Sequence, residues 1–144
     1  MRIMLDTNIL ISMFLFPTEN MNRLKHELCE KHRVLLCSYV VDEIKDVISR
    51  KFKSKEKDLE MFFQSFPFTL VYTPEDFEKE KYPEIRDSHD LPVLVSAIAE
   101  GADILITGDK DFSDVEIDRP EILTPNEYLT QYGREYRISG GGPS

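Results

Sequence analysis

The chain has 144 residues, 41% of them hydrophobic, and a formal net charge of −9. This length fits one folded domain, and the hydrophobic fraction excludes a mainly disordered chain. No apolar run approaches the roughly 20 residues that cross a bilayer, and two cysteines, Cys29 and Cys37, make neither a disulfide framework nor a zinc site, so we expect a reduced, cytoplasmic protein with no membrane partner.

Short apolar runs alternate with helical patterns along the chain. The predicted strands are Arg2–Leu5, Arg33–Cys37, Phe68–Tyr72, Asp103–Thr107 and Glu121–Leu123. Apolar residues at helical spacing predict helices over 9–16, after Thr18, after Ser38, over 55–65, after 87–90 and over 125–132. This alternation predicts a mainly parallel sheet covered on both faces, a three-layer α/β/α domain.

Local signals mark several boundaries. Ser38 is expected to cap the helix after the second strand, and Gly101 suits the exit of the helix before the fourth. Thr124 and Glu127 form a capping box, and Gly133 is expected to end the helix that follows. We therefore expect a folded domain over 1–133 and a flexible tail over 134–144, whose glycine-rich composition is also typical of a cloning remnant.

Acidic residues recur where the predicted strands end, the edge at which open α/β sheets bind ligands. They are Asp6 after the first strand, Glu43 in the helix after the second, Asp87 and Asp90 before the fourth, and Asp109 and Asp111 after it. Each alone is explained by a helix cap, a turn or a surface position. Together, however, several carboxylates would repel one another unless a cation neutralised them.

The ligand type selects the cation. Clustered carboxylates with no neighbouring cysteine are typical ligands of the hard ions Mg²⁺ or Mn²⁺. Such an ion activates a bound water as nucleophile and stabilises the leaving oxygen of a phosphodiester. The residues therefore predict metal-dependent phosphodiester hydrolysis.

The charge distribution bears on the substrate. Residues 1–57 carry a net charge of +3 and residues 58–144 a net charge of −12, and an acidic surface disfavours phosphate binding. The basic run within 50–57 is either a solvated junction between helices or a phosphate contact. The candidate phosphate contacts are Arg50, Lys51, Lys53 and Lys55.

Four motifs resemble those of PIN-domain nucleases and occur in the family's order. They are Asp6-Thr7-Asn8-Ile9-Leu10; Ser38–Ile44, in which Glu43 is the matching acid; Asp87-Ser88-His89-Asp90 before an apolar helix; and Thr107–Phe112. The match covers about residues 1–130 and most resembles the toxin branch, the VapC-type toxins of toxin–antitoxin pairs. The resemblance implies a three-layer α/β/α fold and a Mg²⁺- or Mn²⁺-dependent endoribonuclease.

The resemblance also implies roles for particular residues. The catalytic and metal-binding acids would be Asp6, Glu43, Asp90 and Asp109. Asp90 is preferred to Asp87 because its spacing to the following apolar residues fits the family's helix. Many relatives carry Asn where Asp109 stands and a later acid, so Asp111 is also a candidate metal ligand. Asn8 and Thr107 match positions that orient the carboxylates, and RNA, a homodimer and a small antitoxin are the implied partners.

Two interpretations from other classes stay open. A PIN-like domain can bind RNA or a protein without cutting, although retention of every matching acid argues against this. A carboxylate-based phosphatase or receiver domain ranks last, because Asp6-Thr7-Asn8 lacks the second aspartate that a phosphoaspartate hydrolase shows. The nearby aromatic residues either pack in the core or form a partner surface; they are Phe62, Phe63, Phe66 and Phe68.

Overall fold

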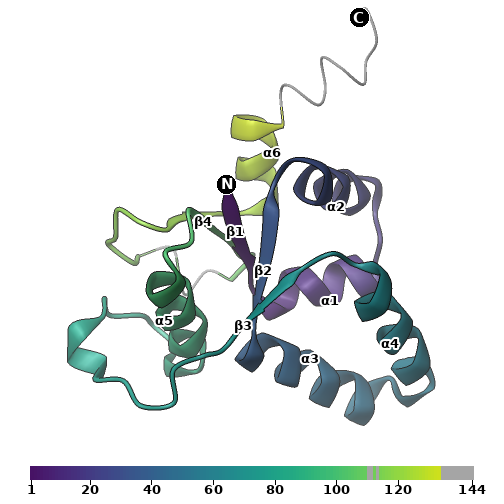
Figure 1. Cartoon of the computed structure of the whole chain (residues 1–144), viewed down its shortest axis with the longest axis horizontal. Coiled ribbons are helices and arrows are strands. Elements are labelled where there is room, and N and C mark those ends of the chain that lie inside the picture. The colour runs from purple at the N-terminus through teal and green to yellow at the C-terminus, as the bar shows by residue number, and fades with distance from the viewer. Residues whose placement is uncertain (110–111, 113, 134–144) are drawn as a thin grey trace, which may run out of the picture.

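A computed structural model describes residues 1–109, 112 and 114–133, so the predicted tail over 134–144 lies outside the described residues. A sheet of five parallel strands, in the order β3-β2-β1-β4-β5, forms its centre (Figure 1). The strands are β1 (Arg2–Leu5), β2 (Arg33–Cys37), β3 (Thr69–Val71), β4 (Ile104–Ile106) and β5 (Glu121–Leu123). All five predicted strands are present, with β3 and β4 shorter than expected.

Helices cover both faces of this sheet. They are α1 (Thr7–Leu15), α2 (Glu19–Lys31), α3 (Ser38–Lys51), α4 (Glu56–Ser65), α5 (Leu91–Glu100) and α6 (Pro125–Tyr132), with 3-10 turns η1 (Lys53–Lys55), η2 (Lys79–Lys81) and η3 (Ser88–Asp90). In Figure 1, α1, α2 and α4 lie to one side of the sheet and α5 to the other. The three-layer α/β/α architecture predicted from the sequence is therefore confirmed.

The core lies where the central strands meet these helices. Ile3, Met4 and Leu5 of β1 are fully buried, as are most side chains of β2 and β4. Burial on both faces explains why these strands are continuous apolar runs rather than alternating ones. The phenylalanine cluster extends the core, because Phe66 is buried and stacks on Phe62 with ring centroids 5.1 Å apart.

Helix ends follow the predicted capping residues with one exception. Thr124 and Glu127 form the capping box, and Gly101 has a φ of 66° at the end of α5, a conformation that favours glycine. The prediction of Ser38 as a cap is wrong. Cys37 occupies that position without a side-chain bond, and Ser38 Oγ instead accepts from Thr73 N over 3.0 Å. The serine therefore ties α3 to the segment after β3.

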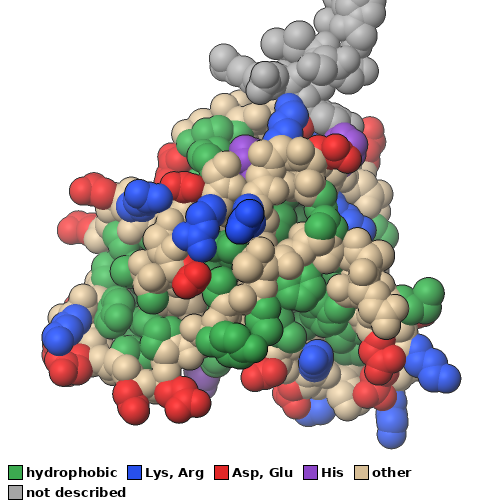
Figure 2. All heavy atoms as spheres, in the orientation of Figure 1, with side chains coloured by type: hydrophobic (Ala, Val, Ile, Leu, Met, Phe, Trp, Pro, Cys, Tyr) green, Lys and Arg blue, Asp and Glu red, His purple; other side chains and the backbone are tan. Residues whose placement is uncertain are grey.

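The surface carries both signs of charge. Figure 2 shows acidic and basic side chains spread over one face, with hydrophobic side chains between them. Within residues 1–133, apart from the few positions left undescribed, we found no helix with the length and hydropathy needed to cross a membrane.

Candidate acidic metal centre

The sheet order creates a crevice at its carboxyl edge. Strand β1 has β2 on one side and β4 on the other: the chain proceeds outward through β2 and β3 and then crosses back to β4 on the opposite side of β1, so the strand order reverses there. Ligands of open α/β sheets bind at such a reversal. Asp6 directly follows β1, and its N–H donates to Ile106 O of β4 over 3.0 Å. The end of the first strand is thereby fixed beside the end of the fourth.

Three aspartates converge at this crevice from distant parts of the chain. Asp6, Asp90 and Asp109 each offer one carboxylate oxygen, and these oxygens lie within 4.8 Å of one another. Asp6 precedes α1, Asp90 ends η3 at the start of α5, and Asp109 follows β4. The Asp90 side chain makes no capping bond to α5, so its position is not explained by helix capping alone.

Hydrogen bonds hold the buried Asp6 in a defined orientation. Thr107 Oγ1 donates to Asp6 Oδ2 over 2.7 Å, and Thr7 N donates to Asp6 Oδ1 over 2.8 Å. Asp109 N in turn donates to Thr107 Oγ1 over 3.0 Å. Thr107 therefore connects two of the three aspartates.

Glu43 lies beside the three aspartates rather than among them. It sits on the second turn of α3, where the Thr7 hydroxyl donates to Glu43 Oε1. Since Thr7 adjoins Asp6, the bond couples α3 to the start of α1. Asn8, for which an orienting role was expected, has an exposed side chain, and Thr7 makes the contact with Glu43 instead.

The convergence changes how these carboxyl groups bind protons. Burial is the main factor that raises the pKa of Asp6; the bonds from Thr107 and Thr7 lower it, and the charges of Asp109 and Glu43 raise it further. Burial, a hydrogen bond with Asp109 and the neighbouring negative charges raise the pKa of Asp90 to about 8. Without a cation Asp90 therefore retains a proton near neutral pH.

The donor set fits a hard divalent cation. Asp90 Oδ2 is buried and has no hydrogen-bond partner among the described residues, although such an oxygen normally finds one. The three converging groups are carboxylates, with no cysteine or histidine in the set, and oxygen ligands suit Mg²⁺ or Mn²⁺. Asp6, Asp90 and Asp109 are thus the residues that would hold such an ion.

Two other predicted acids have different positions. Asp87 is exposed and caps η3, where Asp87 Oδ1 accepts from His89 N over 2.9 Å. The structure thus brings Asp90, and not Asp87, to the other two aspartates. Asp111 lies outside the described residues.

The structure does not bring the basic run to the acidic centre. Arg50 is seven residues beyond Glu43 on α3, which places it about 10 Å further along the helix axis. Its side chain pairs with Asp46, with Arg50 Nε 2.9 Å from Asp46 Oδ2. Lys51, Lys53 and Lys55 follow it and are exposed.

Tyr39 borders the centre, although it is not among the residues predicted from the sequence. Tyr39 Oη donates to His89 O over 2.9 Å, joining the first turn of α3 to the turn that carries Asp90. Burial raises the pKa of Tyr39, and so do the charges of Glu43 and Asp90. The sequence around Tyr39 does not indicate this position, because the tyrosine reaches the centre through a contact with a residue 50 positions away.

Fold and site together define a parallel α/β/α domain with a carboxylate cluster at the carboxyl edge of its sheet. The chain belongs to the PIN domain family, whose family model matches residues 2–111. A comparison with curated proteins found no significant match.

Three solved structures illustrate the likeness of fold. VapBC2 from Rickettsia felis, bound to a promoter DNA fragment, is 21% identical, with a TM-score of 0.66 over 85% of this chain and 97% of that chain. VapC20 from Mycobacterium tuberculosis, a Sarcin-Ricin loop cleaving toxin, is 16% identical, with a TM-score of 0.58 over 77% and 92%. FitAcB from Neisseria gonorrhoeae is 20% identical, with a TM-score of 0.61 over 85% and 97%.

Proposed function

We propose that this protein is a divalent-metal-dependent endoribonuclease that hydrolyses RNA phosphodiester bonds and acts as the toxin of a toxin–antitoxin pair. The observation that carries the proposal is the approach of Asp6, Asp90 and Asp109 to within 4.8 Å at the carboxyl edge of the sheet. Three carboxylates in a half-buried crevice have little structural purpose without a cation, because their mutual repulsion opposes folding.

Each residue has a distinct task in this proposal. A bound Mg²⁺ or Mn²⁺ would polarise the phosphate and lower the pKa of a water molecule. Asp6 is held rigidly by Thr107 and by the Thr7 N–H, so it offers a preset ligand oxygen. Asp90 and Asp109 would complete the ligand set. To Glu43, which accepts from the Thr7 hydroxyl, we assign the role of accepting a proton from the attacking water.

The choice of RNA and of a toxin role rests on likeness. The chain has the PIN domain fold, and VapC20, which has a similar fold, is a Sarcin-Ricin loop cleaving toxin. Following the same resemblance, we include a small antitoxin partner, a homodimer and a cytoplasmic location in the proposal. The two cysteines are free, Cys37 being buried, which agrees with a reducing compartment.

Cleavage assays test the proposal directly. Structured and unstructured RNAs are incubated with the wild type or with Asp6→Asn, in Mn²⁺, in Mg²⁺ and in EDTA. We expect the wild type to cut only with a divalent ion and Asp6→Asn to match the buffer blank, since asparagine removes the charge and keeps the shape. Asp42→Asn is the matched control, because Asp42 is an acid next to Glu43 that lies outside the cluster.

Two outcomes contradict the proposal. Equal cutting by wild type and Asp6→Asn points to a contaminant or to a site elsewhere. Full activity in EDTA excludes metal-dependent hydrolysis. The toxin role is tested separately by inducing expression in cells, where the wild type and Asp42→Asn should arrest growth and Asp6→Asn should not.

A further inference from the structure

Helix α2 buries a charged side chain on its apolar face. Glu27 is fully buried, as are its neighbours Leu24 and Leu28. Neither oxygen of the Glu27 carboxylate has a hydrogen-bond partner among the described residues. Lys31, one turn further along α2, places its Nζ 3.3 Å from Glu27 Oε2 as an ion pair without hydrogen-bond geometry. The charge of Glu27 is therefore balanced, but its capacity to accept hydrogen bonds is not used.

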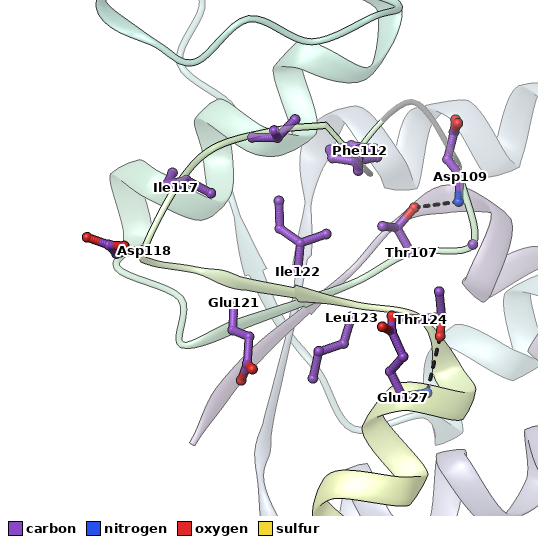
Figure 3. A pocket seen from close by; sticks show the side chains of 12 residues that line it. Thr107, Asp109, Phe112, Ile117, Asp118, Glu121, Ile122, Leu123, Thr124 and Glu127 are labelled. Atoms are coloured by element: carbon purple, nitrogen blue, oxygen red, sulfur yellow. Dashed lines mark hydrogen bonds between the residues drawn. The ribbon is translucent and has the colours of Figure 1, made fainter.

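Tyr128 of α6 carries a second buried polar group of this kind. Its side chain is fully buried, and its hydroxyl makes no hydrogen bond to a described residue. The capping box fixes the start of α6, where Glu127 N donates to Thr124 Oγ1 over 3.1 Å (Figure 3), and Tyr128 follows directly in the chain. A buried hydroxyl normally has a partner, because leaving it without one destabilises the folded state.

Both groups belong to the contact between α2 and α6, which are neighbours in Figure 1. Two interactions bracket Glu27 along α2. Arg23 Nη2 donates to Gly133 O over 3.4 Å, and the His32 ring packs edge-on against Tyr128 with ring centroids 6.3 Å apart. Burial raises the pKa of Tyr128, and the charge of Glu27 raises it further, which agrees with a short distance between the two side chains.

We propose that Glu27 and Tyr128 hold one ordered water molecule, which fastens α6 to α2. Neither group bonds the other, so the group between them must donate to a carboxylate and accept from a phenol. Water does both, whereas a cation accepts nothing and an anion is repelled by Glu27. Lys31 already balances the charge of Glu27, so a neutral ligand also fits the charge. Two carboxylate oxygens and one hydroxyl offer the number of bonds, about three, that a buried water typically makes.

The water site is separate from the acidic centre. His32, which packs on Tyr128, directly precedes β2, and its Nδ1 lies 3.1 Å from the N atom of Met1, which precedes β1. These contacts gather where the strands begin, whereas the three aspartates gather where β1 and β4 end. The inference is therefore independent of the proposed function, and variants of the water site should keep the Mn²⁺ affinity of the wild type.

High-resolution crystal structures of the wild type and two variants test the site directly. In the wild type we expect a water at about 2.7–3.2 Å from Tyr128 Oη and from a Glu27 oxygen, and we expect its loss in Tyr128→Phe. Tyr132→Phe is the matched control. Tyr132 stacks on Tyr128, but its hydroxyl donates to Glu121 Oε1 over 2.8 Å, so this variant should keep the water.

Thermal stability gives a second readout, in which the sign of the change decides. If the water is bound, Tyr128→Phe removes a hydrogen bond that is made, so the melting temperature should fall by about 2–5 °C and amide exchange in α6 should become faster. If no water is bound, the variant removes an unpaired buried hydroxyl, and the melting temperature should stay or rise. The double variant Glu27→Met with Tyr128→Phe leaves neither polar group behind and should recover most of the loss.

Three results would each overturn the inference. The first is a direct hydrogen bond between Tyr128 Oη and Glu27 in the wild-type crystal, and the second is an ion, or no ordered density, between them. The third is an unchanged or raised melting temperature of Tyr128→Phe. If that variant does not fold, the wild-type crystal structure alone decides between the water and the other arrangements.

Discussion

Thr107 Oγ1 donates a hydrogen bond to Asp6 Oδ2 over 2.7 Å, although 101 residues separate the two in the chain. The bond exists because β1 and β4 are neighbours in the sheet and both end at the same crevice. Thr107 also accepts from Asp109 N over 3.0 Å. One threonine therefore sets the relative positions of two candidate metal ligands.

Loss of the Thr107 hydroxyl should weaken metal binding. In Thr107→Val the shape is kept but Asp6 Oδ2 loses its donor, so Mn²⁺ affinity should fall about 10-fold or more. The free energy of unfolding should fall by about 1–3 kcal/mol, because a buried oxygen loses its partner. Isothermal titration calorimetry measures the Mn²⁺ affinity, and urea denaturation measures the free energy of unfolding. Thr107→Ser retains the hydroxyl and should stay close to the wild type; equal behaviour of all three proteins contradicts the assigned role.

Much of the fold could be predicted from local patterns. The apolar runs at Arg2–Leu5 and Arg33–Cys37 coincide with β1 and β2, and the Thr124 capping box begins α6 as expected. These signals are local, since capping and burial act within a few residues. Ser38 shows the limit, because its hydroxyl is used by Thr73, a tertiary contact that no capping rule contains.

The raised pKa of Asp90 predicts a pH dependence for the metal-free protein. Its folded pKa of about 8 exceeds the value of about 3.9 for an unfolded chain. Between about pH 4 and pH 8, folding therefore takes up a proton at Asp90. The contribution of Asp90 to the free energy of unfolding is complete below about pH 4 and is lost as the pH rises to about 8.

The measurement is urea denaturation in EDTA between pH 4 and pH 8 for wild type and Asp90→Asn. The free energy of unfolding of the wild type, relative to that of the variant, should decrease as the pH rises. Groups remote from the centre, such as Asp103, whose pKa is lowered by the Arg2 N–H and by Arg119, are present in both proteins and cancel. Parallel curves for the two proteins would show that Asp90 ionises normally.

The hydroxyl of Tyr39 should help to position Asp90. Tyr39→Phe removes the bond to His89 O, so the turn carrying Asp90 should be less well fixed and the free energy of unfolding should fall by about 0.5–1.5 kcal/mol. Mn²⁺ affinity should decrease as well, which a purely structural bond elsewhere would not cause. Tyr72→Phe is the control, since Tyr72 is 79% exposed; an unchanged Mn²⁺ affinity in Tyr39→Phe rules out the positioning role.

The candidate site was predictable in part. That acids would collect near the ends of β1 and β4 followed from their order in the sequence and from the rule for parallel sheets. The choice of Asp90 over Asp87 came from a family resemblance, and only the tertiary structure shows Asp90 beside Asp6. The contact between Thr7 and Glu43 was not predicted, because Thr7 next to a helix start is equally well explained as a cap.

Substitutions in the basic run within 50–57 test whether bound RNA extends along α3. Double charge reversal, Lys51→Glu with Lys53→Glu, in an Asp6→Asn background that prevents cutting, should weaken RNA binding. If both lysines bind phosphates, the slope of log affinity against log salt should become shallower by about 0.7 for each phosphate that is no longer neutralised. Fluorescence anisotropy at several salt concentrations measures this. Unchanged affinity and slope would leave these residues as a solvated helix end.

Anomalous diffraction from crystals soaked in Mn²⁺ tests the central claim most directly. We predict a manganese peak bounded by oxygens of Asp6, Asp90 and Asp109, at ligand distances of about 2.0–2.3 Å, and no such peak in Asp90→Asn crystals. A manganese peak elsewhere on the chain, with these three carboxylates turned away from it, would contradict the account.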